Sequence, residues 1–399
     1  MTFVTCLLLV SATQTAPTPP TMTLPWGADD FVQYYVALEL LFEGNNPYDQ
    51  ELDTTRQMAY GRKRGVQMLA PPLALLPALL VIGLPFPLAT SGYLALNVTL
   101  LIFCTVCWTL LLFPGRWHFI PLMLIAFSLF LPFQVVLYCG QNSLWPLAGF
   151  TGWLWFTVRK QSIPAGLFLA LTIIKPHLGL LPCLFAGVYL LRQRNWSVIT
   201  TFGLSIVAAT ALTFCLRPTI WAEYFTAIQT GISLSKLHTY TLTGTLRSSQ
   251  IPSLALISYA LWFASFALVS IGTWKAFRPE PELVSALRDS TRYDQLITWS
   301  LCICMMVLPL VIYAWLFDFA FMLPGIILAL GSWLSDQKGG RISLFLWILM
   351  DLWIRLFNYE EGFFIIPWIG LVLTMWLLRS RLPQNITPNA TTLPISAVT

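Results

Sequence analysis

The sequence PPLALLP at residues 71–77 opens an apolar segment that ends near Pro85. The segment has about 13 residues, whereas about 20 are needed to cross the hydrocarbon core of a bilayer as a helix. We therefore predict that residues 71–84 form an interfacial or re-entrant segment. This choice fixes the topology of the chain, because it decides on which side of a membrane every later loop lies.

The chain around this segment is strongly apolar. Of its 399 residues, 57% are hydrophobic and only 10% are charged, and the mean hydropathy is +0.72. This composition is typical of a polytopic membrane protein. The net charge of +5 comes from basic residues that cluster in short loops, as in the cytoplasmic loops of membrane proteins, which argues against nucleic-acid binding. We expect a multi-pass protein of a bacterial plasma membrane.

Long apolar runs fill most of the chain after residue 87. They cover residues 88–113, 117–138, 142–158, 163–174, 177–190, 196–215, 252–273, 295–316, 319–334, 343–357 and 363–378. They predict an all-α integral membrane protein with about 11–12 transmembrane helices and amphipathic juxtamembrane helices in a first extracytoplasmic loop. Several runs are shorter than a standard span, and short helices interrupted by proline usually surround a cavity.

Four parts of the chain follow from these runs. Residues 1–12 form a short first transmembrane segment or a signal-peptide core, and residues 13–87 form an extracytoplasmic loop. Residues 88–378 form the transmembrane domain, and residues 379–399 form a cytoplasmic tail. The basic loops all lie in the cytoplasm if residues 71–84 do not cross. Most of the unusual polar residues then fall on the other face, in residues 13–87, 140–142, 216–251 and 358–362 and at Lys175 and Asp318.

The best candidate for catalysis is in the sequence DDFVQYY at residues 29–35. A carboxylate at a boundary between water and membrane can act as a general base toward a sugar hydroxyl, and Asp30 is the first candidate, followed by Asp29. The alternative is that one of them caps an amphipathic helix predicted for residues 30–43, which Gly44 would end. The two roles are compatible.

Two charged residues interrupt apolar runs farther along the chain. Lys175 lies either at a helix break, where its ammonium can hold a phosphate, or at a helix end from which it snorkels. Asp318 can pair with Lys175 or with Arg247, or cap the next helix. Residues 140–143 (GQNS) predict a polar turn between two helices, and this turn contains Gln141.

The loop at residues 236–247 carries cations, hydroxyls and a glycine, among them His238 and Arg247. Such residues suit a phosphate or sugar ligand, although a solvated loop has the same composition. The cysteines lie almost entirely in apolar runs. Cys104 and Cys107 have the CxxC spacing of a metal site, but their apolar surroundings offer no further ligand and favour core packing. The three histidines are too scattered to suggest a metal cage.

Several motifs, taken in order, resemble those of glycosyltransferase family 87. They are DFxxYYxA at residues 30–37, GxNPY at 44–48, PPL at 71–73, GQxS at 140–143, IKP at 174–176, TLxGxLR at 241–247 and YxxxxD at 313–318. The resemblance spans roughly residues 28–330. It implies a GT-C membrane enzyme whose site faces the extracytoplasmic side and takes a sugar from a polyprenyl-phosphate donor. A juxtamembrane helix would begin at the PPL motif.

The resemblance also implies roles for individual residues. Asp30, with Asp29 second, would be the general base of an inverting transfer. Lys175, Arg247 and His238 would neutralise the leaving phosphate. Tyr34, Tyr35, Gln141 and Asp318 would complete the binding site for the donor.

The substrates follow from the same resemblance. The sugar would be a hexose, with mannose the first choice, and the acceptor a lipid or a glycan. A divalent cation held partly by Asp29 and Asp30 is left open. Two other readings also remain open, a transporter or lipid flippase and a non-catalytic subunit of an envelope-glycan assembly system.

Overall fold

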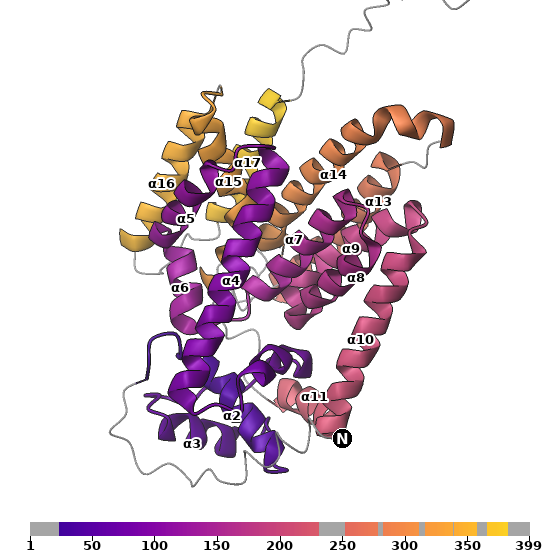
Figure 1. Cartoon of the computed structure of the whole chain (residues 1–399). Coiled ribbons are helices and arrows are strands. Elements are labelled where there is room, and N and C mark those ends of the chain that lie inside the picture. The colour runs from indigo at the N-terminus through magenta and orange to yellow at the C-terminus, as the bar shows by residue number, and fades with distance from the viewer. Residues whose placement is uncertain are drawn as a thin grey trace, which may run out of the picture.

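The structure is a computed structural model that describes residues 24–230, 252–277, 282–310, 316–337, 339–356 and 365–381. The predicted first segment at residues 1–12, the predicted site residues His238 and Arg247, and most of the predicted tail lie outside these residues. Within the described residues every regular element is a helix (Figure 1). The prediction of an all-α membrane protein is therefore confirmed.

Each of the predicted apolar runs overlaps at least one helix. In chain order the elements are α2 (Phe31–Phe42), α3 (Gln50–Ala59), η1 (Pro72–Leu80), α4 (Phe86–Leu112), α5 (Phe119–Leu129), α6 (Leu131–Cys139), α7 (Leu144–Val158), α8 (Ser162–Leu171), η2 (Thr172–Ile174), α9 (Pro176–Arg192), α10 (Trp196–Leu216), α11 (Ile220–Thr230), α13 (Pro252–Ala276), α14 (Glu282–Leu310), η4 (Leu316–Met322), α15 (Leu323–Leu334), α16 (Gly340–Leu356) and α17 (Ile365–Arg381).

The helices differ in whether they are long enough to cross a membrane. Among the described residues, α4 and α10 are long and apolar enough, and the bent pair α5 and α6 adds a third if it is one span. Other apolar helices have 10–17 residues. The number of about 11–12 spans stays a prediction.

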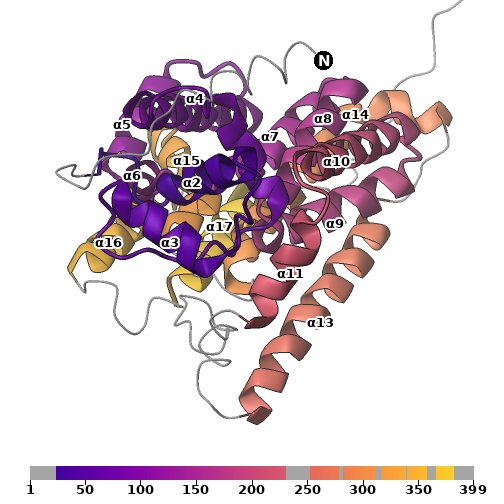
Figure 2. The ribbon, with the colours of Figure 1, turned by 90° about the horizontal axis from the view of Figure 1, so that it is seen from below.

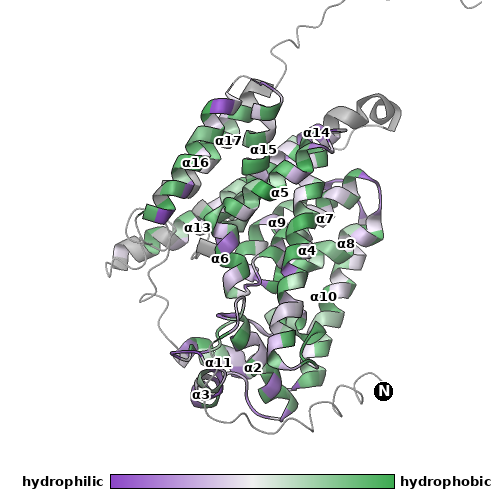
Figure 3. Ribbon diagram, turned by 60° about the vertical axis from the view of Figure 1, so that its left-hand side comes forward, coloured by the Kyte–Doolittle hydropathy of each residue, from purple (hydrophilic) through white to green (hydrophobic). Residues whose placement is uncertain are grey.

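The N-terminal helices gather at one end of the molecule. Figure 1 shows α2, α3 and α11 below the bundle, and Figure 2 shows α2 and α3 on the same side as α4, α5 and α6, with α13 at the opposite edge. Hydrophilic residues are frequent around α3 at this end, whereas α4, α7 and α8 are mostly hydrophobic (Figure 3). The bundle is thus mostly apolar, and hydrophilic residues are frequent at the end that carries α3.

Helix α2 is buried on nearly all sides, so the prediction of an amphipathic helix was wrong. Nine of its 12 residues are buried, from Phe31 to Leu41. The cause is that α3, η1 and α4 all pack against it, so that Val32, Val36 and Leu40 also find apolar neighbours. Its predicted end is confirmed, because Gly44 follows the C-cap with a φ of +79°.

The segment at residues 71–84 contains η1, a 3₁₀ helix of nine residues. At about 2 Å per residue it extends only about 18 Å, well short of a bilayer core. Leu73, Ala74 and Leu75 are buried, and the Asn142 side chain donates a hydrogen bond of 2.8 Å to the Ala74 carbonyl. The segment is therefore held against the bundle, as the prediction that it does not cross requires.

Helices α5 and α6 meet at an angle of 72°. The bend frees backbone groups that would otherwise bond within a helix, and these must find other partners inside a membrane. Residues of α16 provide them. The Leu131 amide donates to Asp351 Oδ1 at 2.7 Å, Arg355 donates to the Leu129 carbonyl, and the two side chains pair with each other.

Candidate functional site

The turn between α6 and α7 meets the chain that enters α2. The Asp30 amide donates to the Cys139 carbonyl at 2.7 Å. Gly140 adopts a left-handed conformation with a φ of +67°, and a Cβ there would lie 2.2 Å from the Gly27 carbonyl oxygen. Only glycine satisfies both conditions, so the GQNS turn is confirmed and places Gln141 beside Asp30.

We expect Gly140→Ala to destabilise the protein and to lower its activity, because the left-handed conformation alone costs about 1–2 kcal/mol and the clash with Gly27 must also be relieved. Thermal unfolding in detergent measures the effect. Gly203→Ala on α10 is the control, since a Cβ there has nothing within 4 Å. Equal stability of the two variants would contradict the role given to Gly140.

The Asp30 carboxylate accepts three hydrogen bonds. Its Oδ1 accepts from Gln33 Nε2 at 3.0 Å and from Arg62 at 3.1 Å. Its Oδ2 accepts from Gln141 Nε2 at 2.6 Å. Asp30 occupies the N-cap position of α2, but its side chain makes no capping hydrogen bond. The interpretation of the carboxylate as a helix cap was therefore wrong, because the carboxylate is directed at Arg62 and Gln141 instead.

Burial raises the pKa of the Asp30 carboxyl above its ordinary value. The hydrogen bond from Gln141, the charge of Arg62 and the more distant charge of Lys175 lower this pKa in part, while the charge of Asp29 raises it. A carboxylate with a raised pKa binds a proton more strongly, which is what a general base requires.

Lys175 lies between η2 and α9, so the predicted helix break is confirmed. Its ammonium donates to Asp318 Oδ1 at 2.6 Å, to Ser143 Oγ at 2.9 Å and to Gln141 Oε1 at 3.5 Å. Asp318 is fully buried, and the Lys175 side chain is 12% exposed. The alternative that Lys175 snorkels was wrong, and Asp318 pairs with Lys175. His177 Nε2 lies 3.9 Å from the other oxygen of Asp318.

Gln141 joins the two charged pairs. Its amide nitrogen donates to Asp30, and its oxygen accepts from Lys175 and from the Tyr34 hydroxyl at 3.2 Å. The result is one continuous cluster of Arg62, Asp30, Gln141, Lys175 and Asp318. We call these five residues the charged cluster.

The two tyrosines of the YY pair point in different directions. Tyr34 contacts Gln141, whereas the Tyr35 hydroxyl donates to the Leu84 carbonyl at 3.1 Å. The Tyr35 ring packs against Tyr60 and Phe86. The structure therefore brings Tyr34 into contact with the charged cluster, whereas Tyr35 packs among aromatic side chains.

Sequence reasoning missed Arg62. It lies 32 residues from Asp30 and is the first residue of a basic triplet that also contains Lys63 and Arg64. No spacing or motif separates Arg62 from these two neighbours. Ser143 and His177 were also not proposed as site residues, although each lies two residues from one that was, Gln141 or Lys175.

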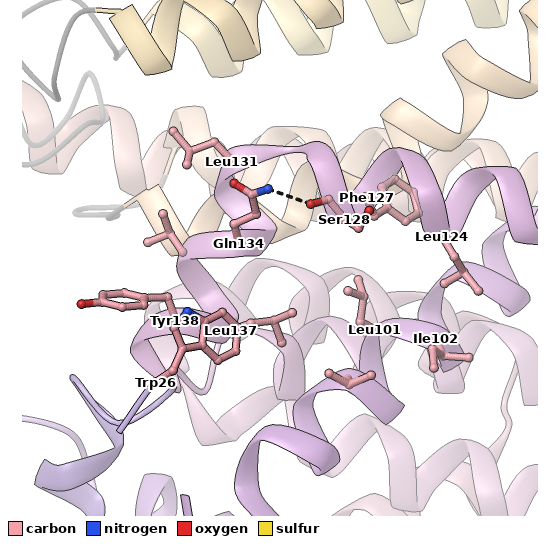
Figure 4. Close-up of a pocket in the computed structure, with 12 residues that line it drawn as sticks. Trp26, Leu101, Ile102, Leu124, Phe127, Ser128, Leu131, Gln134, Leu137 and Tyr138 are labelled. Carbon is pink, nitrogen blue, oxygen red and sulfur yellow. Dashed lines mark hydrogen bonds between the residues drawn. The ribbon is translucent and has the colours of Figure 1, made fainter. Parts of the chain in front are cut away.

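An apolar groove lies between α4, α5 and α6, with a volume of about 680 Å³. Trp26 and Tyr138 stand at one end of it, and Ile102 and Leu124 at the other (Figure 4). Tyr138 precedes Cys139, whose carbonyl binds the Asp30 amide. The one amide side chain of the lining, Gln134, donates to the Ser128 carbonyl at 2.7 Å. The groove thus leads from the apolar bundle to the neighbourhood of Asp30.

The described residues contain no group of three or more His, Cys, Asp or Glu side chains that could hold a metal ion. Cys104 and Cys107 are both buried, and Cys104 belongs to the main hydrophobic core, as the sequence predicted. A divalent cation at Asp29 and Asp30 stays a prediction.

The fold and the charged cluster together define an all-α membrane protein with a charged, partly buried candidate site at the start of α2. The model of Glycosyltransferase family 87 matches residues 69–291, more than half of the chain, and the chain belongs to this family. It is therefore a glycosyltransferase, and the resemblance of its motifs is confirmed. The match includes Gln141 and Lys175 and begins after Asp30 and Arg62. No curated protein and no solved structure matches the chain.

Proposed function

We propose that the chain transfers a hexose, with mannose the first choice, from a polyprenyl-phosphate donor to a lipid or glycan acceptor, with inversion at the anomeric carbon. Asp30 is the general base. The observation that carries this proposal is the bonding of its carboxylate. An ionised carboxylate has about four lone-pair sites, and protein donors occupy two on Oδ1 and one on Oδ2. Within the described part of the chain, one site on Oδ2 is left for an acceptor hydroxyl.

The reaction is a single displacement. The acceptor oxygen forms a bond to the anomeric carbon while its proton passes to Asp30 Oδ2. The bond from the anomeric carbon to the phosphate oxygen breaks, and polyprenyl phosphate leaves with the electron pair. Inversion follows because the acceptor attacks opposite the leaving group.

The leaving phosphate needs positive charge near it. Lys175 is the candidate within the described residues, and we propose the same role for Arg247 and His238. Asp318 already neutralises much of the Lys175 charge, so its role is to hold the ammonium beside Ser143 and Gln141 and not to touch the sugar. Tyr34 and Gln141 are placed to contact the donor sugar or phosphate.

The apolar groove supports a lipid-linked donor, because an isoprenoid chain lying between α4, α5 and α6 would end near Asp30. Ile102→Trp should fill part of this groove. Losing about 55 Å² of apolar contact costs ~1.4 kcal/mol at ~25 cal/mol/Å², so KM for a long-chain donor should rise about tenfold. A donor with a very short chain should be unaffected.

Ile271→Trp on α13 is the control for this variant, since Ile271 is 53% exposed and α13 lies at the opposite edge of the molecule (Figure 2). A KM that rises equally for long and short donors, or equally in both variants, would contradict the binding of the donor chain in the groove.

The donor itself is tested with purified protein in lipid nanodiscs. Radiolabelled polyprenyl-phosphate mannose should give labelled acceptor, and radiolabelled nucleoside diphosphate mannose should give no labelled acceptor. Label from the nucleotide sugar alone would overturn the proposed donor. Label from a polyprenyl phosphate that carries another hexose, and not from the mannose donor, would change the sugar and keep the reaction.

We also propose that the site faces the extracytoplasmic side of a bacterial plasma membrane. The charge distribution of the loops supports this orientation. So does the position of Asp30 at the start of α2, because Figure 1 shows α2 with α3 and α11 at one end of the molecule. A transporter is expected to hold its polar site near the middle of the membrane, whereas these polar residues concentrate at one end.

A further inference from the structure

Arg62 reaches Asp30 from the loop that follows α3. Its guanidinium lies 3.1 Å from Asp30 Oδ1, and the two side chains are only 9% and 15% exposed. An ion pair shielded from water to this extent interacts more strongly than a surface pair. Arg62 should therefore have a strong electrostatic effect on the Asp30 carboxylate.

A buried glutamine fixes the other side of the guanidinium. Gln57 is completely buried, and its Oε1 accepts from Arg62 at 2.9 Å and from the Val66 amide at 3.0 Å. Its Nε2 donates to Asp53 Oδ1 and to the Val66 carbonyl, both at 2.8 Å. Asp53 in turn accepts from the Met68 amide. Both donors and the acceptor oxygen of Gln57 are thus engaged.

The loop around Arg62 is also packed tightly on α3. A Cβ at Gly65 would lie 2.3 Å from Thr54 Cβ, so the loop has no space to move closer. The position of Arg62 is therefore determined by α3 and by Gln57 as well as by Asp30. An arginine held in this way can position the carboxylate that it contacts.

We propose that Arg62 is a positioning residue for sugar transfer. It keeps the Asp30 carboxylate ionised and occupies Oδ1, so that the free lone pair of Oδ2 is directed to the acceptor. Gln57 holds Arg62 in place. This role rests on the proposed function, in which Asp30 is the general base.

The charges around Asp30 determine what loss of Arg62 would do. Arg62 and Lys175 favour the ionised carboxylate, and Asp29 disfavours it. Lys175 is already paired with Asp318, so Arg62 is the main cation among the described residues that acts on Asp30. A cation within about 4–6 Å lowers a carboxyl pKa by about 1–3 units. Without Arg62, the pKa of Asp30 should rise further.

The test compares the pH dependence of kcat/KM in wild type, Arg62→Gln and Arg62→Lys. In wild type the rate falls as pH decreases through the Asp30 pKa, because the base must be ionised. In Arg62→Gln the midpoint of this fall should lie at least about one pH unit higher than in wild type. At a given pH below both midpoints, kcat/KM should then be about tenfold lower than in wild type. Activity should recover at higher pH. Arg62→Lys keeps the charge without the planar fork and should show a smaller shift.

Arg64→Gln is the matched control, because it removes an exposed cation from the same loop and should leave the pH profile unchanged. A purely structural role for Arg62 would lower the rate equally at all pH values, and that result would overturn the proposal. A shift of the same size in Arg64→Gln would also overturn it. If Arg62→Gln does not fold, Arg62→Lys decides, and an unchanged profile in that variant contradicts the role.

A second measurement does not depend on activity. Infrared difference spectra recorded against pH contain a protonated-carboxyl band for Asp30, identified by its loss in Asp30→Asn. Its midpoint should be higher in Arg62→Gln than in wild type, and an equal midpoint overturns the role of Arg62. If wild type transfers no sugar but the midpoint shifts, the proposed donor is wrong and the positioning of Asp30 by Arg62 stands.

Discussion

Asp30→Asn is expected to lower the transfer rate by about 10²–10⁴-fold, the usual contribution of a general base, while the protein still folds. Asparagine has nearly the same shape as aspartate but cannot take the proton of the acceptor hydroxyl. The rate is measured with labelled donor in membranes that contain equal amounts of each protein. Retention of full activity in Asp30→Asn would contradict the assignment of the base.

Asp29→Asn is the neighbouring control. Asp29 acts on Asp30 through its charge, so this variant should lose less activity than Asp30→Asn. The pH profile gives an independent check. Because the Asp30 pKa is raised, kcat/KM of the wild type should rise with pH through a midpoint above the ordinary aspartate value of about 3.9. A greater loss in Asp29→Asn than in Asp30→Asn would exchange the two roles.

Asp318→Asn is expected to give the largest loss of stability. The Asp318 carboxylate is completely buried and lies 2.6 Å from the Lys175 ammonium, which is 12% exposed. Removing one partner of a buried ion pair leaves the other charge uncompensated, which costs about 3–5 kcal/mol. Thermal unfolding in detergent should show the loss, and the double variant Lys175→Met with Asp318→Asn should recover part of it.

Asp336→Asn is the control for this pair. Asp336 and Arg341 form an ion pair whose side chains are 85% and 79% exposed, and exposed pairs contribute little to stability. The stability of this variant should therefore stay close to that of wild type. If Asp318→Asn were as stable as Asp336→Asn, the buried pair of Lys175 and Asp318 would not contribute to stability as expected.

Local sequence signals predicted much of the fold. The apolar runs located the helices because burial in lipid or in a core requires long stretches of apolar side chains. Proline and glycine marked the start of η1, the GQNS turn and the break at Lys175, since these residues restrict or widen the backbone angles. Counting the basic loops predicted that Asp30, Gln141, Lys175 and Asp318 lie on the same side of the membrane, and in the structure these four residues form one cluster.

The features that sequence did not predict depend on contacts between distant parts of the chain. Arg62 differs from Lys63 and Arg64 because it donates a hydrogen bond to the buried Gln57. No local sequence pattern predicts this contact. The bend between α5 and α6 is completed by Asp351 and Arg355, more than 200 residues away. Likewise, α2 is buried on most sides because three other helices enclose it.

The most direct test of the central claim, that the charged cluster is the active site, is a cryo-electron microscopy structure with a non-transferable donor. The donor would be a polyprenyl phosphonate in which carbon replaces the oxygen between sugar and phosphorus. We predict that the sugar lies beside Asp30 Oδ2, with the phosphonate near Lys175 and the isoprenoid chain in the groove between α4, α5 and α6. Well-defined density for the sugar away from Asp30 and Lys175 would contradict the claim.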